Sequence, residues 1–182
     1  FNIHTAHSFA LRELRSMGVK FKISNKGMDP DEIIARLGMY NGAASVRYTI
    51  AKMVQDGISA ACNRIDGSIM PIDFKDYDKP TVAKYFNKVV QSVNFFLHEM
   101  ASGNIPMTHD FYLKLYAKQK KSIPCHYLLF DEGQDANEVM LDIFLNQKCT
   151  RIIVGDPAQQ IYSWRGAVNA LEKVNFRTYA LT

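Results

Sequence analysis

The chain has 182 residues, of which 47% are hydrophobic and 22% are charged, and its formal net charge is +4. This length and composition predict a folded protein with one large domain, or one domain that carries an insertion. They exclude a membrane-spanning protein, because no apolar run approaches the roughly 18 residues that a span requires. The sequence starts FNIHTAHSF, without an initiator methionine or a signal peptide, so we expect a piece of a longer protein.

The charges are distributed unevenly along the chain. Residues 1–60 contain 8 Lys and Arg against 5 Asp and Glu, and residues 61–122 contain 9 against 6, whereas residues 123–182 contain 5 against 7. A basic N-terminal part is suited to binding a polyanion, and an acidic C-terminal part is suited to binding a metal ion. The 3 cysteines are odd in number and form no CxxC pair, which favours a reducing, intracellular compartment over a disulfide framework.

The first predicted elements are a short strand at FNIH, a polar loop, and a helix that starts near Phe9 and stops at Gly18. The loop contains three polar side chains, those of Thr5, His7 and Ser8. His4 and His7 form an HxxH pair, but no Cys or carboxylate lies close by in sequence to complete a zinc site. We therefore interpret this pair as polar residues at a strand end.

Helical patterns dominate the middle of the chain. They are expected at residues 29–38, 43–56, 81–101 and 111–121, with a turn-rich interval before the third. Asp29, Pro30 and Glu32 predict the N-cap, the first position and the capping box of the first of these helices, and Gly38 its end. Asp110 is expected to cap the last of them.

The final third of the chain predicts a strand, a helix and a second strand. YLLF and RIIV are short apolar runs, and ANEVMLDIFLNQ between them has helical spacing. A βαβ unit of this kind implies parallel strands covered by helices. Ligands of such sheets collect at the carboxyl ends of the strands, and the loops that follow both strands lie at that edge.

The first of these loops is acidic. In YLLFDEGQDAN, Asp131 and Glu132 stand where the strand should end. Two such carboxylates serve nucleoside triphosphate chemistry, in which one holds Mg²⁺ through hard oxygen ligands and the other orients and deprotonates the attacking water. The alternative is an acidic cluster that caps the following helix, a role that Asp135 could supply.

The second loop, GDPAQQIYSWRGA, carries two glutamines, a tyrosine, an arginine and the only tryptophan of the chain. DEGQD, one helix and then IIVGDPAQQIYSWRGA together resemble motifs II and III of the UvrD/Rep-like superfamily 1 DNA helicases. TAHSF is similar to the T-x-H-x-φ segment (φ apolar) of that family. Within that family, the F-box DNA helicase branch is the one that most resembles two segments of this sequence, MTHDFYLKLY and GDPAQQIYSWRGAVNAL.

The resemblance implies roles for the nucleotide site. Asp131 would hold Mg²⁺, Glu132 would be the general base, and Gln159 would sense the γ-phosphate of ATP and couple its hydrolysis to movement. A glutamine amide suits the last role because it both donates and accepts hydrogen bonds, and so registers a phosphate or water that is lost after hydrolysis.

The resemblance also implies a grip on single-stranded DNA. Tyr162 and Trp164 would stack on bases, an interaction of about 1–3 kcal/mol per base that does not depend on sequence. Arg165 would steady this aromatic loop or meet the DNA backbone. The segment that would touch the strand contains Thr5, His7 and Ser8. The alternative for Trp164 is a place in the core.

Two features of the family pattern are missing. No Gly-Lys pair occurs anywhere, so the phosphate-binding loop GxxxxGK[ST] is absent, and so are the later motifs with the arginines of a second motor domain. We therefore expect an α/β fold that forms part of a RecA-like parallel-sheet motor domain, without its P-loop strand and with a helical insertion. The motor domain would comprise residues 1–20 and 111–182, and the insertion residues 21–110. The isolated chain should be inactive.

The implied function is that of an ATP- and Mg²⁺-dependent DNA helicase that acts on single strands or junctions, in the 3′ to 5′ direction, with the remaining helicase domains in cis. The resemblance implies a place with the DNA inside the cell, in repair or recombination, with protein partners possible outside this chain. One alternative is a related RNA helicase, whose acidic loops more often read DEAAQ and lack the QIYSWRGA signature. The other is a degenerate module that binds single strands or a protein without catalysis.

Overall fold

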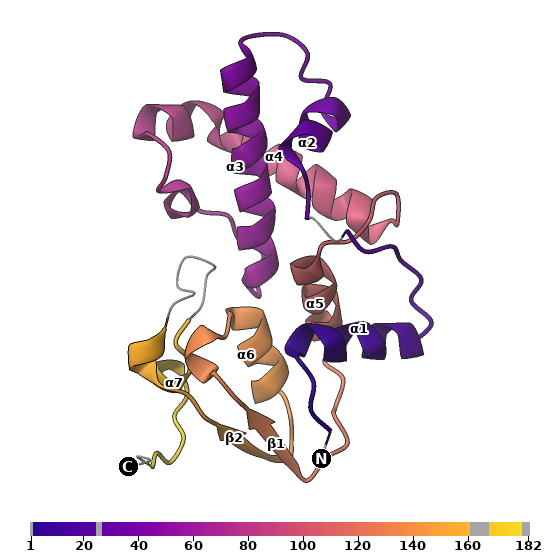
Figure 1. The fold of residues 1–182 in the computed structure, drawn as a ribbon, viewed down its shortest axis with the longest axis vertical. Helices are drawn as coiled ribbons and strands as arrows, with labels where there is room; N and C mark the ends of the chain where they lie inside the picture. The colour runs from indigo at the N-terminus through magenta and orange to yellow at the C-terminus, as the bar shows by residue number, and fades with distance from the viewer. Residues whose placement is uncertain (1, 25–26, 161–167, 180–182) are drawn as a thin grey trace.

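The computed structural model describes residues 2–24, 27–160 and 168–179. Its helices, drawn in Figure 1, are α1 (Ala6–Ser16), α2 (Pro30–Arg36), α3 (Ala44–Asn63), α4 (Lys79–Ala101), α5 (His109–Lys118), α6 (Glu138–Leu145) and α7 (Ala170–Lys173). The strands are β1 (Tyr127–Phe130) and β2 (Thr150–Ile153), and short 3₁₀ turns are η1 (Pro71–Phe74), η2 (Gly133–Asp135) and η3 (Pro157–Gln159). Within these ranges, no helix is both long enough and apolar enough to cross a membrane.

The predicted βαβ unit is confirmed. β1 and β2 pair in parallel, with Tyr127 opposite Thr150, and α6 connects them. The sheet of the described residues has these 2 strands, and the larger sheet of a RecA-like domain stays a prediction. One face of the pair leaves Tyr127, Leu129 and Ile152 exposed, although both faces of a parallel sheet are normally covered.

The predicted strand at FNIH is wrong. Residues 2–5 form no strand, and Thr5 is the N-cap of α1, where its side chain accepts a hydrogen bond from the Ser8 backbone N–H. A strand lies beside another strand that pairs with its backbone groups. Ile3 here is 91% exposed, as expected for a segment that does not pack against a sheet. The helix that follows ends near the predicted stop, because Gly18 takes the left-handed φ of 78° just beyond its C-cap.

The predicted helices of the middle are all present, but one capping box and one N-cap differ from the prediction. Asp29 caps α2 as expected, by accepting from the Asp31 N–H, whereas Glu32 pairs with Arg36 instead of completing a capping box. The cap of α5 is Thr108, not Asp110, which lies in the first turn of that helix.

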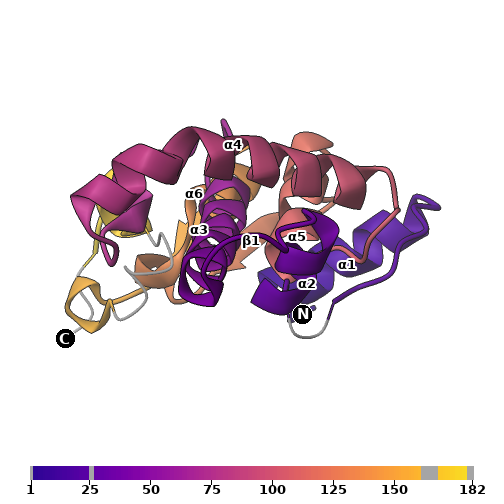
Figure 2. The ribbon, with the colours of Figure 1, turned by 90° about the horizontal axis from the view of Figure 1, so that it is seen from above.

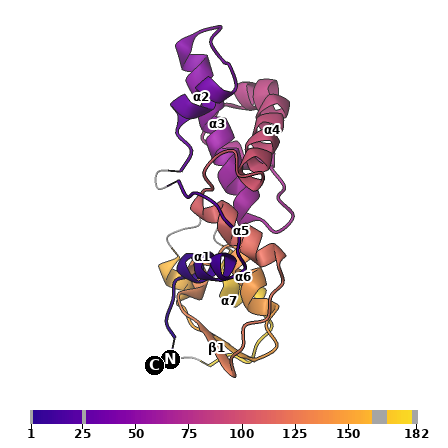
Figure 3. The same ribbon diagram turned by 90° about the vertical axis from the view of Figure 1, so that its right-hand side faces the viewer.

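Helices α2, α3 and α4 form one end of the molecule, and the strands with α6 and α7 form the other, with α1 and α5 between them (Figures 1 and 3). Figure 2 shows α4 lying across α3. Their contact is close at Gly57, where an added Cβ would lie 2.8 Å from a methyl group of Val93. A glycine therefore sets the distance between the two longest helices.

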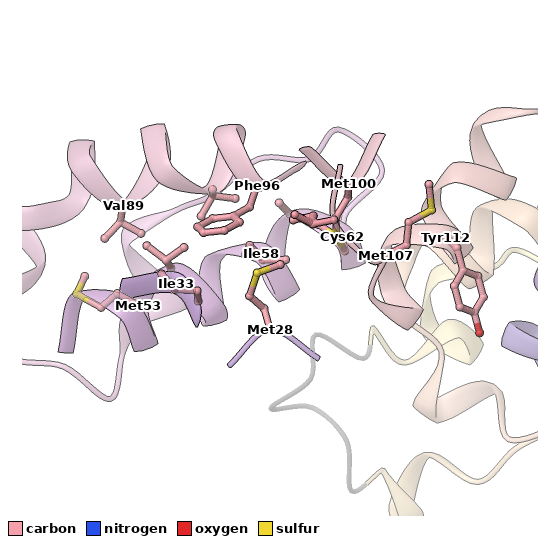
Figure 4. Close-up of a cluster of buried hydrophobic side chains, with 14 of the residues drawn as sticks. Met28, Ile33, Met53, Ile58, Cys62, Val89, Phe96, Met100, Met107 and Tyr112 are labelled. Atoms are coloured by element: carbon pink, nitrogen blue, oxygen red, sulfur yellow. The ribbon is translucent and has the colours of Figure 1, made fainter. Parts of the chain in front are cut away.

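The main hydrophobic core is continuous from this helical end to α5. Figure 4 shows side chains of α3 and α4 facing one another, with Met100 and Cys62 leading on to Tyr112 of α5. A smaller core lies around α6, where Phe144 packs with Leu141, Ala136 and Ala170. The boundary predicted between residues 110 and 111 falls in the first turn of α5.

Polar contacts fix the carboxyl end of α3 to the rest of the molecule. The Lys114 ammonium, on α5, donates to the carbonyl oxygens of Ala61 (2.5 Å) and Arg64 (2.8 Å) at that end. Burial lowers the pKa of Lys114. The buried side chain of Asn63 accepts from the Asn137 amide at 2.6 Å. Since Asn137 is the N-cap of α6, this contact places α3 directly beside the segment that follows the acidic loop.

All three cysteines are free thiols. Cys62 is buried, and this burial raises the pKa of its thiol to about 12. Cys125 and Cys149 lie at the amino ends of the two strands, with their sulfur atoms 3.4 Å apart. The sequence alone does not predict that these two cysteines lie close together, because their contact follows from the parallel pairing of β1 and β2.

Candidate functional site

The two loops that follow the strands lie side by side. The backbone N–H of Val154 donates to the Phe130 carbonyl, and the N–H of Gly133 donates to the Val154 carbonyl, both at 2.8 Å. These bonds continue the parallel ladder beyond the last strand residues and hold the acidic loop against the loop that starts at Gly155. The predicted meeting of the two loops at the carboxyl edge of the sheet is therefore confirmed.

Asp131 and Glu132 are both exposed at this edge. Glu132 has φ 55° and ψ 42°, the left-handed conformation that non-glycine residues rarely take. Such a conformation costs about 1–3 kcal/mol and is found where a site requires a particular direction of the chain. It is held by the Glu132 N–H, which donates to the Asp131 carboxylate at 3.0 Å, and by the Glu132 carbonyl, which accepts from Asp135 at 2.9 Å.

The alternative in which Asp135 caps the following helix is wrong. Asn137 is the cap of α6, and its side-chain oxygen accepts from the Met140 N–H at 2.8 Å. Asp135 belongs to the turn η2, and its Oδ1 atom is buried without a hydrogen-bond partner in the part of the chain that the structure describes. The acidic loop is thus not a helix cap, and two of its carboxylates, those of Asp131 and Glu132, face solvent.

A residue that the sequence analysis missed, Gln134, lies between the two loops. Its side chain is 1% exposed. Its amide nitrogen donates to the Glu132 carboxylate at 2.5 Å, and its amide oxygen accepts from the Asp156 N–H at 3.1 Å. The signal available in the sequence was an uncharged amide inside a run of acidic residues, DEGQD.

Glycines allow this close approach of the loops. A Cβ at Gly155 would lie 2.3 Å from the Gln134 side-chain oxygen and 2.9 Å from the Gly133 nitrogen, and a Cβ at Gly133 would lie 2.6 Å from the Ile153 side chain. Real Cβ atoms do not come so close to backbone or buried side-chain atoms. Both positions therefore require glycine because of the space available.

Gly155→Ala should lower the free energy of unfolding by about 1–3 kcal/mol, because the added methyl group overpacks the contact between the loops. Urea unfolding of the full-length protein measures this change. Ala158→Ser, on the exposed turn of the same loop, is the control and should stay within about 0.5 kcal/mol of the wild type. Equal stability of Gly155→Ala and the wild type would contradict the packing described for the two loops.

Gln159, the predicted sensor, lies in η3 on the second loop and is exposed. Its side-chain amide donates to the Asp156 carboxylate at 2.8 Å. That bond, with a second from the Ala158 N–H, holds the pKa of Asp156 below its usual range. The structure thus brings Gln159 to the same edge as Glu132, but its hydrogen bond is to its own loop.

The aromatic part of the second loop lies outside the described residues. Tyr162, Trp164 and Arg165 therefore stay predictions. The residues on either side are attached to the acidic segment. The Gln160 side chain donates to the Gln134 carbonyl at 3.0 Å, and the Val168 N–H donates to the Ala136 carbonyl at 2.7 Å.

Thr5, His7 and Ser8 lie together at the start of α1. The hydroxyl of Ser8 donates to the Thr5 carbonyl, so these two side chains complete the first turn of the helix. The His7 ring contacts Asp110 at 3.3 Å and the edge of Tyr112, at the junction of α1 with α5. Of the hydrogen bonds found in the described residues, none joins this trio to the acidic loop.

Two kinds of metal site were considered from the sequence, a zinc site at the HxxH pair and a Mg²⁺ site at the acidic loop. His4 bonds to the Arg12 side chain at 2.7 Å, and within the described ranges no three His, Cys, Asp or Glu side chains gather to hold a metal ion. Mg²⁺ does not need such a group, because it keeps several waters and is held by one or two carboxylates plus substrate phosphates. The exposed, hard oxygen atoms of Asp131 and Glu132 fit that kind of site.

The model of the UvrD/REP helicase N-terminal domain matches residues 1–173, almost the whole chain. The chain belongs to this family. Its mixed helical fold with a small parallel sheet is consistent with such a domain. The resemblance found in the two loop motifs and in the opening segment is thereby confirmed.

Two curated relatives are similar to part of the chain. F-box DNA helicase 1 of Gallus gallus is 49% identical over 69 residues, which are 37% of this chain and 7% of that protein. F-box DNA helicase protein 1 of Schizosaccharomyces pombe is 44% identical over 66 residues, which are 34% of this chain and 8% of that protein. The matched stretches thus span less than a tenth of either relative. No solved structure gives a significant match.

Proposed function

We propose that the chain is part of an ATP-dependent DNA helicase and supplies one side of its nucleotide site. The observation that carries this proposal is the joining of two family motifs, DEGQD and GDPAQQ, at one edge of a parallel sheet in a chain that belongs to the UvrD/REP helicase family. Both relatives are named as F-box DNA helicases, which supports DNA as the substrate of the whole protein.

Three residues would perform the nucleotide chemistry. Asp131 would hold Mg²⁺, which when bound supplies positive charge to the phosphate oxygens. Glu132 would accept the proton of the attacking water, and its exposed position at the strand end, set by the left-handed backbone, supports this role. Gln159 would respond to the γ-phosphate. Its bond to Asp156 is between two exposed side chains, so exchange for a phosphate contact costs little.

The DNA grip would consist of Tyr162, Trp164 and Arg165 on the second loop. The anchoring of both ends of this segment to residues 134–136 supports a link between the grip and the acidic loop. The segment with Thr5, His7 and Ser8 would contact the strand as well. Since their side chains already cap α1 and pack on α5, a phosphate group would approach the remaining backbone N–H groups at the start of α1.

The proposed division of the chain is a motor domain at residues 1–20 and 111–182 with a helical insertion at residues 21–110. The exposed apolar face of the sheet, with Tyr127 and Leu129, supports a motor domain that further elements of a longer protein complete. The remaining helicase domains would act in cis, and the protein would work inside the cell with its DNA.

Strand displacement by the full-length protein tests this function. Duplexes with a 3′ single-stranded tail should be unwound in the presence of ATP and Mg²⁺, and duplexes with a 5′ tail much less. Duplexes with a single-stranded RNA tail show whether the protein moves on DNA or on RNA. Displacement that proceeds equally without ATP, or that never occurs although ATP is hydrolysed, would contradict the proposed activity.

Trp164→Ala in the full-length protein should weaken single-strand binding by about 1–3 kcal/mol, the value of one stacked base, and should lower unwinding. Turnover of ATP without DNA should survive. Fluorescence anisotropy with a labelled oligonucleotide measures the binding. Tyr179→Ala is the control, because Tyr179 is an exposed aromatic residue outside the second loop. If Trp164→Ala instead unfolds the protein, Trp164 belongs to the core and not to the grip.

A further inference from the structure

The buried polar side chain of Gln134 is not explained by packing alone, and neither the resemblance nor the comparisons assign it a role. We infer that Gln134 is a positioning residue, which fixes the carboxylate of Glu132 and ties it to the loop after β2. This inference deepens the proposed function and rests on it, because it concerns the residue proposed as the general base.

The orientation of the Gln134 amide is determined by its two partners. The Asp156 backbone N–H can only donate, so the amide oxygen must face it, at 3.1 Å. The amide nitrogen then necessarily points to the Glu132 carboxylate, which can accept, at 2.5 Å. A flipped amide would oppose two donors on one side and two acceptors on the other. Only one arrangement is therefore satisfied, and it directs a hydrogen-bond donor at the proposed base.

The surroundings leave this arrangement no alternative. The side chain is 1% exposed, so water cannot replace either bond. Gly155 lies so close that its Cβ position is 2.3 Å from the Gln134 oxygen, and Gly133 is bonded to the Val154 carbonyl on the other side. Glu132 itself leaves the strand in a left-handed conformation, and the bond from Gln134 holds the tip of its side chain.

The same residue connects the base to the second loop. Through its side chain Gln134 contacts Asp156, which also bonds to Gln159, and through its carbonyl it accepts from the Gln160 side chain. A shift of the loop at residues 155–160 therefore reaches the Glu132 carboxylate through a single side chain. This arrangement would make the position of the base depend on the state of the loop that leads toward the DNA-binding motif.

The test measures ATP turnover by the full-length protein with and without single-stranded DNA. Gln134→Met keeps the length of the side chain and removes both hydrogen bonds. It should lower kcat about 10- to 100-fold, leave the KM for ATP within about twofold, and reduce the stimulation by DNA. Gln147→Met is the matched control, because Gln147 is also a buried glutamine, bonded to Ile123 and Ile143 away from both loops. It should cost stability and leave the stimulation unchanged.

Gln134→Glu keeps the test decisive if Gln134→Met does not fold. It retains an acceptor for the Asp156 N–H, but it replaces the amide donor that faces Glu132 with a second carboxylate oxygen. Two acceptors then oppose one another, so turnover should be low at neutral pH. Turnover should recover as the pH falls, because a protonated carboxyl group again donates to Glu132. A variant that merely disturbs the structure would not gain activity in acid.

Two further results separate this inference from the proposed function. In single-turnover measurements, Glu132→Gln and the double variant with Gln134→Met should be equally slow, because Gln134 acts through Glu132. If Glu132→Gln is slow but Gln134→Met behaves like Gln147→Met, or if the two losses add, Gln134 is not a positioning residue and the proposed function stands. If Glu132→Gln retains normal turnover, the proposed role of Glu132 fails first.

Discussion

Glu132→Gln in the full-length protein should lower the steady-state turnover of ATP about 100-fold or more, because an amide cannot accept the proton of the attacking water. Binding of the nucleotide should persist, since the change keeps the shape of the side chain and its contact with Gln134. Phosphate release measures turnover, and titration with a fluorescent ATP analogue measures binding.

Glu32→Gln is the matched control for this variant. Glu32 is a half-exposed glutamate on α2, paired with Arg36, and such a surface pair contributes at most about 1 kcal/mol. Its turnover should equal that of the wild type. Normal steady-state hydrolysis by Glu132→Gln would remove Glu132 from the mechanism, and a loss of nucleotide binding together with turnover would assign it to binding instead.

The isolated 182-residue chain should neither bind ATP tightly nor hydrolyse it. Phosphates are held in such sites by the backbone N–H groups of a glycine-rich loop and by its lysine, with a Ser or Thr hydroxyl on Mg²⁺, and this sequence contains no Gly-Lys pair. Asp131 and Glu132 alone would hold Mg²⁺ weakly, because the ion relies on substrate oxygens as well.

Calorimetry with ATP and Mg²⁺, together with a phosphate-release assay, measures both parts of this expectation. Weak, salt-sensitive binding of single-stranded DNA should remain, and it should decline as the salt concentration rises. Micromolar binding of ATP with turnover stimulated by DNA would contradict it, and would mean that residues within the chain provide a phosphate site of another kind.

Much of the fold could be predicted because its signals are local. Asp29 followed by Pro30 marked the start of α2, and the long apolar periodicity marked α4. The errors in the helix caps lie where a neighbouring residue took the predicted role. Thr108 rather than Asp110 caps α5, and Asp110 contacts His7 on another helix, at a distance in sequence that no local pattern includes.

The meeting of the two loops at one edge of the sheet could be predicted from the sequence, but the geometry of the candidate site could not. The motifs pointed to Asp131 and Glu132. The left-handed backbone conformation of Glu132 could not be predicted from the sequence, because glutamate has no preference for that conformation. The role of Gln134 depends on Asp156, which approaches only after the strands have paired. Asn137 likewise caps α6 and meets Asn63 of α3, which lies far away in the sequence.

The turnover of ATP by the full-length protein, measured with and without single-stranded DNA in the presence of Mg²⁺, tests the central claim most directly. The claim is that these two loops form one side of a nucleotide site that responds to DNA. It predicts phosphate release that requires Mg²⁺ and rises when single-stranded DNA is added. Absence of turnover in the presence of DNA, or turnover that DNA leaves unchanged, would contradict it.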